Sequence, residues 1–167
     1  MRLPALPVLG LSVLLAACAA NPWNVADIPP GSTKADVLAR AGQPARTYPR
    51  PEGGERLLYT MQPMGRYVFV ADLDASGRVV DSGQMLTEAN LQKIQPGKWT
   101  TKDVEYDFGP PATIDRVASW NGPVWTYRWR ATDTDMFYWI YFTPEGVVAR
   151  AHPGMEMINA PNDRASR

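Results

Sequence analysis

The sequence IPPGSTKADV at residues 28–37 has a counterpart, longer by one residue, in IQPGKWTTKDV at residues 94–104. A glycine and a proline follow each copy, in GQP at residues 42–44 and GPP at residues 109–111. Three later pairs keep nearly the same spacing: Tyr59 with Tyr127, Gly77 with Gly146, and Met85 with Met155. Self-similarity of this kind marks a chain assembled from repeated units, so the sequence predicts two tandem copies of one fold.

Each copy contains the start of a helix. Thr33 and Thr100 are typical N-cap residues, and an aspartate three residues later, Asp36 or Asp103, occupies the capping-box position. Apolar residues then recur at three- or four-residue spacing until the glycine that follows each copy ends the helix. A shorter helix is expected at residues 87–93 before the second copy, and residues 23–28 are a candidate for that role before the first.

After each helix the spacing of apolar residues changes to the alternation of β-strands. The expected strands are residues 56–61, 66–74 and 78–85 in the first copy, and residues 124–130, 136–143 and 147–152 in the second. The sequence therefore predicts an α+β fold with two tandem αα-βββ units, at residues 24–86 and 87–158. In each unit, helices pack on one face of an antiparallel sheet.

The N-terminus has the features of an export signal. Arg2 precedes an apolar run that is shorter than the roughly 20 residues that span a bilayer. The run ends in LAAC at residues 15–18, which resembles the lipobox of bacterial lipoproteins, and Cys18 is the only cysteine in the chain. This resemblance implies that residues 1–17 are removed, that Cys18 is lipidated and that residues 18–23 form a tether. An ordinary secretory signal is the alternative.

The expected location follows from the same segment. Acyl chains on Cys18 would hold the protein on a membrane without spanning it. Ala19 follows the cysteine, rather than the aspartate that resembles an inner-membrane retention signal. We therefore expect a lipid-anchored protein at the outer membrane that faces the periplasm. At the other end, the polar residues 159–167 are expected to form a disordered tail.

Composition argues against several classes of function. The chain has 17 basic and 17 acidic side chains, which is not the charge excess of a nucleic-acid-binding protein. One cysteine and one histidine leave few ligands for zinc, and we expect no metal and no cofactor. His152 lies at the end of a predicted strand, and the aspartates near strand ends are typical of turns. We therefore do not expect an enzyme.

The paired motifs and the strands that follow them resemble the SmpA/OmlA (BamE-like) outer-membrane lipoproteins. That resemblance covers both copies and implies a small helix pair on a three-stranded sheet. The duplication is similar to that of the β-lactamase inhibitory proteins, which use two such units to form one continuous curved sheet. In those proteins, the concave face of the sheet holds the protein partner.

The two central strands indicate where a partner would bind. One row of side chains suits the helix-covered side of the sheet: Tyr67, Phe69, Ala71 and Leu73, with Met136, Tyr138, Ile140 and Phe142. The alternate row should face solvent, but apart from Asp72 it consists of apolar and aromatic residues: Val68, Val70, Phe137, Trp139 and Tyr141. An exposed apolar area with Trp and Tyr marks a protein-binding site.

Two other interpretations of that row remain open. Trp139 could pack beneath the loop at residues 131–135, since a tryptophan in a strand is usually part of a core. A small ligand could instead bind in a cleft between the two units. In the strand at residues 124–130, the sequence does not decide whether the tryptophans or the arginines face the helices.

Two functions follow from these observations. The first is a lipid-anchored periplasmic adaptor that binds proteins at the outer membrane, with a role in the assembly of the envelope or of outer-membrane proteins. The second is an inhibitor-like module that occupies a periplasmic enzyme with its aromatic sheet face. Both use a protein partner and a membrane anchor, and neither involves nucleic acid.

Overall fold

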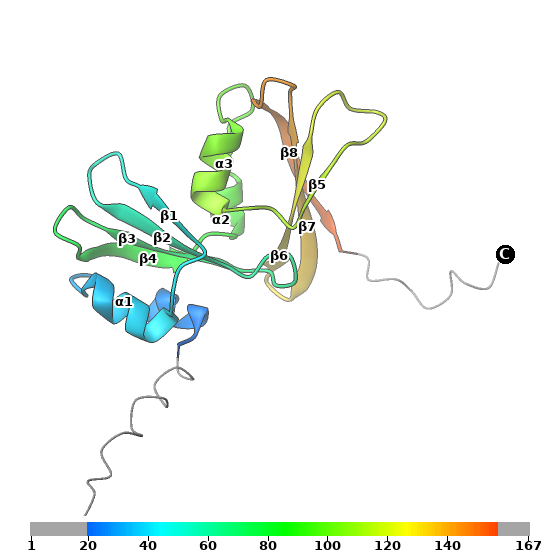
Figure 1. Ribbon diagram of the computed structural model, residues 1–167. Helices are drawn as coiled ribbons and strands as arrows, with labels where there is room; N and C mark the ends of the chain where they lie inside the picture. The colour runs from blue at the N-terminus through cyan, green and yellow to red at the C-terminus, as the bar shows by residue number, and fades with distance from the viewer. Residues whose placement is uncertain (1–19, 157–167) are drawn as a thin grey trace, which may run out of the picture.

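The computed structural model describes residues 20–156, which form two halves, each with a four-stranded antiparallel sheet (Figure 1). The elements of the first half are the 3-10 helix η2 (Pro22–Asp27), α1 (Lys34–Ala41), β1 (Arg46–Pro49), β2 (Glu55–Thr60), β3 (Val68–Leu73) and β4 (Val79–Gln84). Those of the second half are α2 (Glu88–Leu91), α3 (Thr101–Phe108), β5 (Thr113–Asp115), β6 (Val124–Ala131), β7 (Thr134–Phe142) and β8 (Val148–Met155). The predicted α+β class in two repeated sections is confirmed.

Each sheet has one strand more than the three expected. The strand orders are β1-β2-β3-β4 and β5-β6-β7-β8, and every neighbouring pair is antiparallel. The additional strands, β1 and β5, are short and largely exposed, so they have no apolar alternation that the sequence could reveal. The sheets are also separate, in contrast to the continuous sheet of the inhibitory proteins.

The two halves begin their main helices in the same way. The backbone N–H of Thr33 donates to the Asp36 carboxylate at 2.8 Å, and that of Thr100 donates to the Asp103 carboxylate at 2.7 Å. Each contact satisfies a donor that would otherwise be free at a helix start, and places a negative charge at its positive end. The predicted capping boxes are therefore present at both sites.

A tyrosine on the second strand of each half fixes the end of the helix. The hydroxyl of Tyr59 donates to the carbonyl of Gly42 at 3.0 Å, and the hydroxyl of Tyr127 donates to the carbonyl of Gly109 at 2.6 Å. Both glycines have positive φ, of 81° and 68°, which side chains with a Cβ rarely adopt. A Cβ on Gly109 would also lie only 2.7 Å from Leu58, so this glycine lets α3 approach the first sheet.

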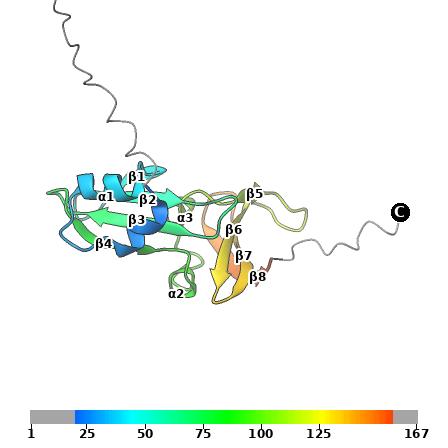
Figure 2. The same cartoon turned by 90° about the horizontal axis from the view of Figure 1, so that it is seen from below.

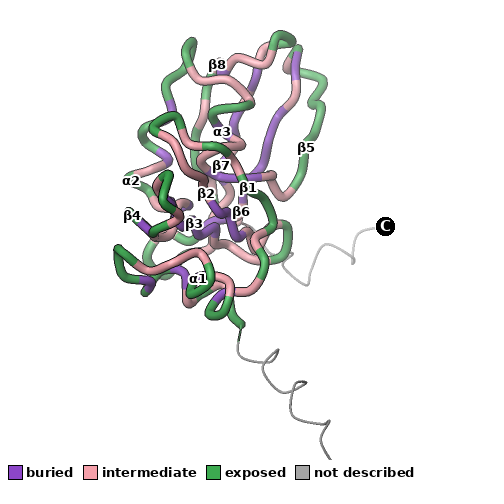
Figure 3. Tube along the Cα trace, turned by 60° about the vertical axis from the view of Figure 1, so that its left-hand side comes forward, coloured by how far each residue is buried: buried purple, intermediate pink, exposed green. Residues whose placement is uncertain are grey.

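The first sheet is covered on both faces, whereas the second is covered on one. One face of the first sheet packs against η2 and α1 through Leu57, Tyr59, Phe69, Ala71 and Leu73. Its other face contributes Leu58, Val68 and Val70 to a core shared with α3 and the second sheet, where Phe108, Tyr127 and Ile140 lie. Figure 1 shows α1 and α3 on opposite sides of the first sheet, and Figure 3 shows the buried residues gathered in the central strands.

A buried ionic cluster joins the first sheet to α3. Arg56 donates to both carboxylate oxygens of Asp72 at 2.7 and 2.8 Å, and to Asp107 at 2.9 Å. Its guanidinium also lies over the Tyr106 ring, 4.3 Å from the centroid. Burial raises the pKa of Asp107, and the neighbouring Arg56 opposes that rise. Because Arg56 comes from β2 and Asp107 from α3, the cluster fixes how the two halves pack.

A second contact joins the loop between β2 and β3 to the second sheet. The Gln62 amide donates to the carbonyl of Arg128 at 2.6 Å and accepts from its backbone N–H at 3.2 Å. Arg66 pairs with Glu156 at 3.1 Å and with Asp135 at 3.0 Å. The second sheet therefore lies at one end of the first in a defined orientation, as the view from below shows (Figure 2).

Within residues 20–156, no helix has the length and apolar character that crossing a membrane requires.

Candidate binding surface

The structure divides the predicted surface row between the core and the outside. Val68 and Val70 are 0% and 3% exposed, so the prediction that they face solvent is wrong. The reason is that α3 and the second sheet cover this face of the first sheet. The signal was present in the sequence: VFVADL in β3 is almost continuously apolar, which is typical of a strand buried on both faces.

Phe137, Trp139 and Tyr141 lie on the open face of the second sheet. All three are half-buried, whereas their neighbours Tyr138 and Ile140 are buried against the helices. The row of β6 on this side is also defined, because Trp125, Tyr127 and Trp129 face the core, which leaves Thr126, Arg128 and Arg130 on the opposite side of the strand, where Thr126 is buried, Arg128 half-buried and Arg130 exposed. We call this side of β5–β8 the outer face.

Aromatic side chains form a connected layer on the outer face. The Phe137 and Trp139 ring centroids are 5.7 Å apart, and His152 on β8 lies 5.4 Å from Trp139 and 5.6 Å from Tyr141. Trp120, from the loop before β6, meets Tyr141 edge-on at 5.5 Å. We refer to these five side chains as the aromatic layer.

Two residues on β8 shape this layer. Arg150 lies over the Tyr141 ring at 3.9 Å, so one ring face is covered by a cation. Gly154 leaves room for the Trp139 indole, because a Cβ there would lie 2.2 Å from the ring. Trp139 thus packs over the glycine of the neighbouring strand. The sequence alone did not place Trp120, Arg150 or His152 at this surface. Strand pairing brings Arg150 and His152 beside Tyr141 and Trp139, and the Trp120 indole N–H donates to the carbonyl of Phe142 at 2.8 Å.

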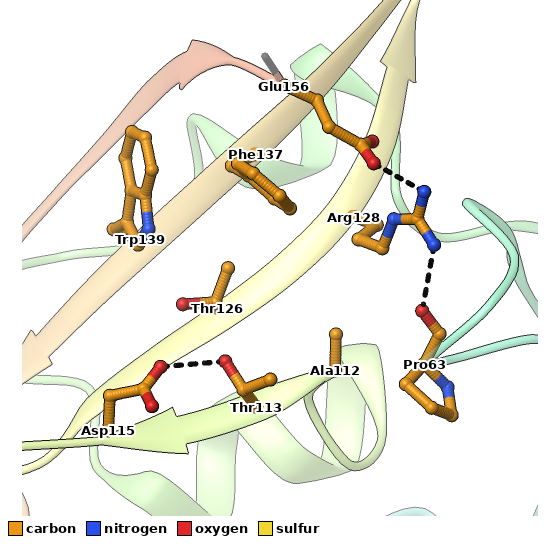
Figure 4. Close-up of a pocket in the computed structure, with 9 residues that line it drawn as sticks. All are labelled: Pro63, Ala112, Thr113, Asp115, Thr126, Arg128, Phe137, Trp139 and Glu156. Carbon is orange, nitrogen blue, oxygen red and sulfur yellow. Dashed lines mark hydrogen bonds and ion pairs between the residues drawn. The ribbon is translucent and has the colours of Figure 1, made fainter. Parts of the chain in front are cut away.

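A hollow of about 520 Å³ lies beside the aromatic layer (Figure 4). It is lined by Pro63, Ala112, Thr113, Asp115, Thr126, Arg128, Phe137, Trp139 and Glu156. The small side chains of Ala112, Thr113 and Thr126 lie between the large aromatic rings and the edge of β5, and this difference in size creates the depression. Three strands (β5, β6 and β7), Glu156 directly after β8 and a loop of the other half contribute to it, so no local sequence pattern indicates it.

Charged groups at one end of the hollow are tied to the loop of the first half. Arg128 donates to the carbonyls of Met64 at 2.9 Å and Pro63 at 3.3 Å, and it forms a close ion pair with Glu156. The Glu156 side chain is only 6% exposed. At the other end, the Thr113 hydroxyl donates to Asp115 at 2.8 Å, and both side chains are exposed. At one end of the hollow, the charges of Arg128 and Glu156 are paired and held in place. The other end carries the accessible carboxylate of Asp115.

Two of the aspartates near strand ends, Asp72 and Asp74, have structural roles. Asp72 is bound by Arg56 as described above, and Asp74 accepts hydrogen bonds from the backbone N–H groups of Ser76 and Arg78 in the turn before β4. The Ser76 hydroxyl, which also donates to Asp74, and these backbone groups lower the pKa of Asp74. Among residues 20–156, no cluster of three or more His, Cys, Asp or Glu side chains could hold a metal ion.

Several predictions fall outside the described residues. Cys18 and residues 1–17 precede them, and residues 157–167 follow them. The lipid anchor, the export signal and the C-terminal tail therefore stay predictions from sequence.

Comparison with known proteins assigns no family. No protein-family model matches the chain, and no curated protein matches it. Among solved structures, it is similar to a DUF4309 family protein (YjgB) from Bacillus subtilis subsp. subtilis str. 168, at 18% sequence identity and a TM-score of 0.31. That similarity covers 75% of this chain and 79% of the other.

Proposed function

We propose that this chain is a protein-binding module that holds its partner on the outer face of the second sheet. One observation carries the proposal. The two halves share one fold. The second half covers one face of the first sheet, whereas the equivalent face of the second sheet, the outer face, is open and aromatic. Half-buried Trp, Tyr and Arg side chains are the types that dominate the binding energy of protein interfaces.

We further propose that a lipid on Cys18 anchors the module at the outer membrane, facing the periplasm. The LAAC sequence supports this, as does the resemblance of each repeat to the SmpA/OmlA (BamE-like) lipoproteins. In this setting the module acts as an adaptor in the assembly of the envelope or of outer-membrane proteins. The anchor keeps it at the surface where that assembly takes place.

The second candidate is an inhibitor-like module that occupies a periplasmic enzyme. The hollow favours it, because a partner that inserts one large side chain there would gain a central anchor beside the aromatic layer. The two candidates use the same face and differ only in the partner.

Site-specific photo-crosslinking in intact cells tests the binding face. A benzoyl-phenylalanine is placed at Tyr141 in one strain and, as a matched control, at Val80 in another, since Val80 is an exposed apolar residue on the first sheet. The proposal expects a discrete protein adduct from position 141 and none from position 80. Mass spectrometry of the adduct separates the candidates: an outer-membrane assembly component supports the adaptor, and a single soluble enzyme supports the inhibitor. Equal adducts from both positions, or none from position 141, would refute the proposed face.

The anchor is tested separately by fractionation. Replacing Cys18→Ser should move the protein from the membrane fraction to the soluble periplasmic fraction. The adduct at position 141 should survive if the partner is soluble, because the binding face is unchanged. An unchanged membrane location in the Cys18→Ser variant would contradict lipid anchoring.

A further inference from the structure

The hollow on the outer face has chemistry that a protein surface alone does not require. We propose that it is a saccharide site, which binds a pyranose ring of a glycan. The inference does not rest on the proposed protein partner, because the residues that define the hollow are largely different from the aromatic layer. Only Phe137 and Trp139 belong to both.

The aromatic wall supplies the surface for a sugar ring. Trp139 and Phe137 stand side by side along the hollow, with centroids 5.7 Å apart and ring planes tilted by 47°, so two apolar rings border the space (Figure 4). A pyranose has a face formed by C–H groups that carry a small positive charge. Such a face is attracted to the negative face of an indole, and contact between them removes apolar area from water.

The opposite wall supplies groups that match hydroxyls. Asp115 is exposed and accepts one side-chain hydrogen bond, from Thr113, among the described residues, so it can accept further hydrogen bonds. The Thr113 hydroxyl, whose proton is donated to Asp115, can still accept, and the Thr126 hydroxyl can donate or accept. Each sugar hydroxyl also donates and accepts, so a pyranose can satisfy this wall. A purely apolar side chain in the hollow would remove the Asp115 carboxylate from water without a partner, which is costly.

The size and rigidity of the hollow also fit a small ligand. A volume of about 520 Å³ lies within the range of roughly 300–1,000 Å³ that is usual for ligand pockets. Arg128 at one end is held by Glu156 and by the carbonyls of Pro63 and Met64, so that end is already ordered. A preformed site loses little entropy on binding. Because Pro63 comes from the first half, the complete hollow exists only in the duplicated chain.

Saturation-transfer NMR on the full chain tests the proposal. The protein is purified in lauryldimethylamine oxide, which contains no sugar, and is mixed with chitotriose or with cellotriose. We expect transfer to the ring protons of at least one trisaccharide, and the comparison shows whether N-acetyl groups contribute. Asp115→Asn should weaken the affinity about tenfold, in line with the loss of a hydrogen bond to a charged group. Trp139→Leu should abolish transfer.

Matched variants separate this site from the protein-binding face. Asp81→Asn changes an exposed aspartate on the first sheet and should leave saccharide binding unchanged. Tyr141→Ser should leave it unchanged as well, although it should impair capture of a protein partner. Circular dichroism establishes that each variant is folded, and Asp115→Asn keeps the test valid if Trp139→Leu unfolds the protein.

Three outcomes would overturn the saccharide site. The first is no transfer to either trisaccharide, and the second is transfer that Asp115→Asn does not reduce. The third is loss of the photo-crosslinked protein in the Asp115→Asn variant without any sugar binding, which would assign the hollow to the protein partner. A sugar that binds while position 141 gives no adduct would support this site and refute the proposed protein-binding face.

Discussion

The outer face of the second sheet has an equivalent in the first sheet, because the two halves share one fold. That equivalent face is buried, whereas the outer face is open. When the repeats are aligned through their paired tyrosines and glycines, Leu58 of β2 is equivalent to Thr126 of β6, and Val70 of β3 is equivalent to Trp139 of β7. Leu58 and Val70 lie in the core between the halves, whereas Thr126 and Trp139 line an open hollow. The second half therefore covers the first sheet, whereas within residues 20–156 the equivalent face of the second sheet is covered only at its margins, by Trp120 and by the loop at Pro63.

The outer face of the second sheet is not polar, although no helix in the described part of the chain covers it. A solvent-facing sheet normally alternates with polar residues, yet β7 places Phe137, Trp139 and Tyr141 there. Aromatic contacts and the stacking of Arg150 on Tyr141 hold these side chains in place before any partner arrives. A surface that is both apolar and ordered is suited to binding, because little side-chain entropy remains to be lost.

The largest expected effect comes from one substitution made at equivalent positions of the two sheets. Val68→Lys should destabilise the protein by about 3–5 kcal/mol or prevent folding, because it buries an unpaired charge. Phe137→Lys should cost less than about 2 kcal/mol, since the ammonium can reach water along the outer face. Urea unfolding of both variants measures the contrast. Similar losses in the two variants would mean that the outer face of the second sheet is not open.

The next effect compares two charged clusters at the junction of the halves, one around Arg56 and one around Arg128. Arg56→Met should lower the free energy of unfolding by about 3 kcal/mol, because Asp72, with a side chain only 8% exposed, loses its main partner. Arg128→Met should cost about 1 kcal/mol, since Glu156 keeps Arg66 at 3.1 Å. Urea unfolding again gives both values. An equal effect of the two substitutions would show that the cluster around Arg56 does not dominate the interface.

Local signals in the sequence were sufficient for much of this fold. The threonine caps, the helix-ending glycines and the alternation in the central strands act within a few residues of one another, so they predicted the repeat and the helix-covered row. The strands β1 and β5 were missed because short, exposed strands bury no row of side chains. Their existence depends on pairing with β2 and β6.

The candidate site was only partly predictable for a different reason. Phe137, Trp139 and Tyr141 stand in one strand, so alternation alone placed them on one face. Alternation within one unit predicts that Val68 and Val70 lie at the surface, but the second unit covers the first and buries them. The hollow depends on Pro63 and Thr113, which are 50 residues apart in the sequence and belong to different halves.

Alkaline pH should weaken the tyrosine contacts that both halves share. Burial raises the pKa of Tyr59 to about 12 and that of Tyr127 well above its usual range. Ionisation therefore favours the unfolded state, in which a tyrosine loses its proton near pH 10. The stabilisation is complete below pH 10 and is lost as the pH rises through about 12, and Tyr59 alone accounts for about 2 kcal/mol of this change.

Urea unfolding as a function of pH, with tyrosinate absorbance as a second signal, measures this loss. Tyr59→Phe and Tyr127→Phe should each flatten the decline above pH 10, because each removes one group that titrates differently in the two states. A decline that is unchanged in both variants would assign it to other buried tyrosines, such as Tyr48, whose pKa is also about 12 because of burial and the nearby Glu105.

The smallest expected effect concerns a feature in which the halves should not differ. Thr33→Ala and Thr100→Ala each remove a helix cap whose hydroxyl donates to an aspartate, at 2.7 and 2.8 Å. Each variant should lose about 1 kcal/mol of unfolding free energy, the usual cost of losing such a cap. Equal losses in urea unfolding would show that the repeats are equivalent locally, and that the contrast between their sheets arises from packing. A loss confined to one half would show instead that the difference between the repeats extends to the starts of their helices.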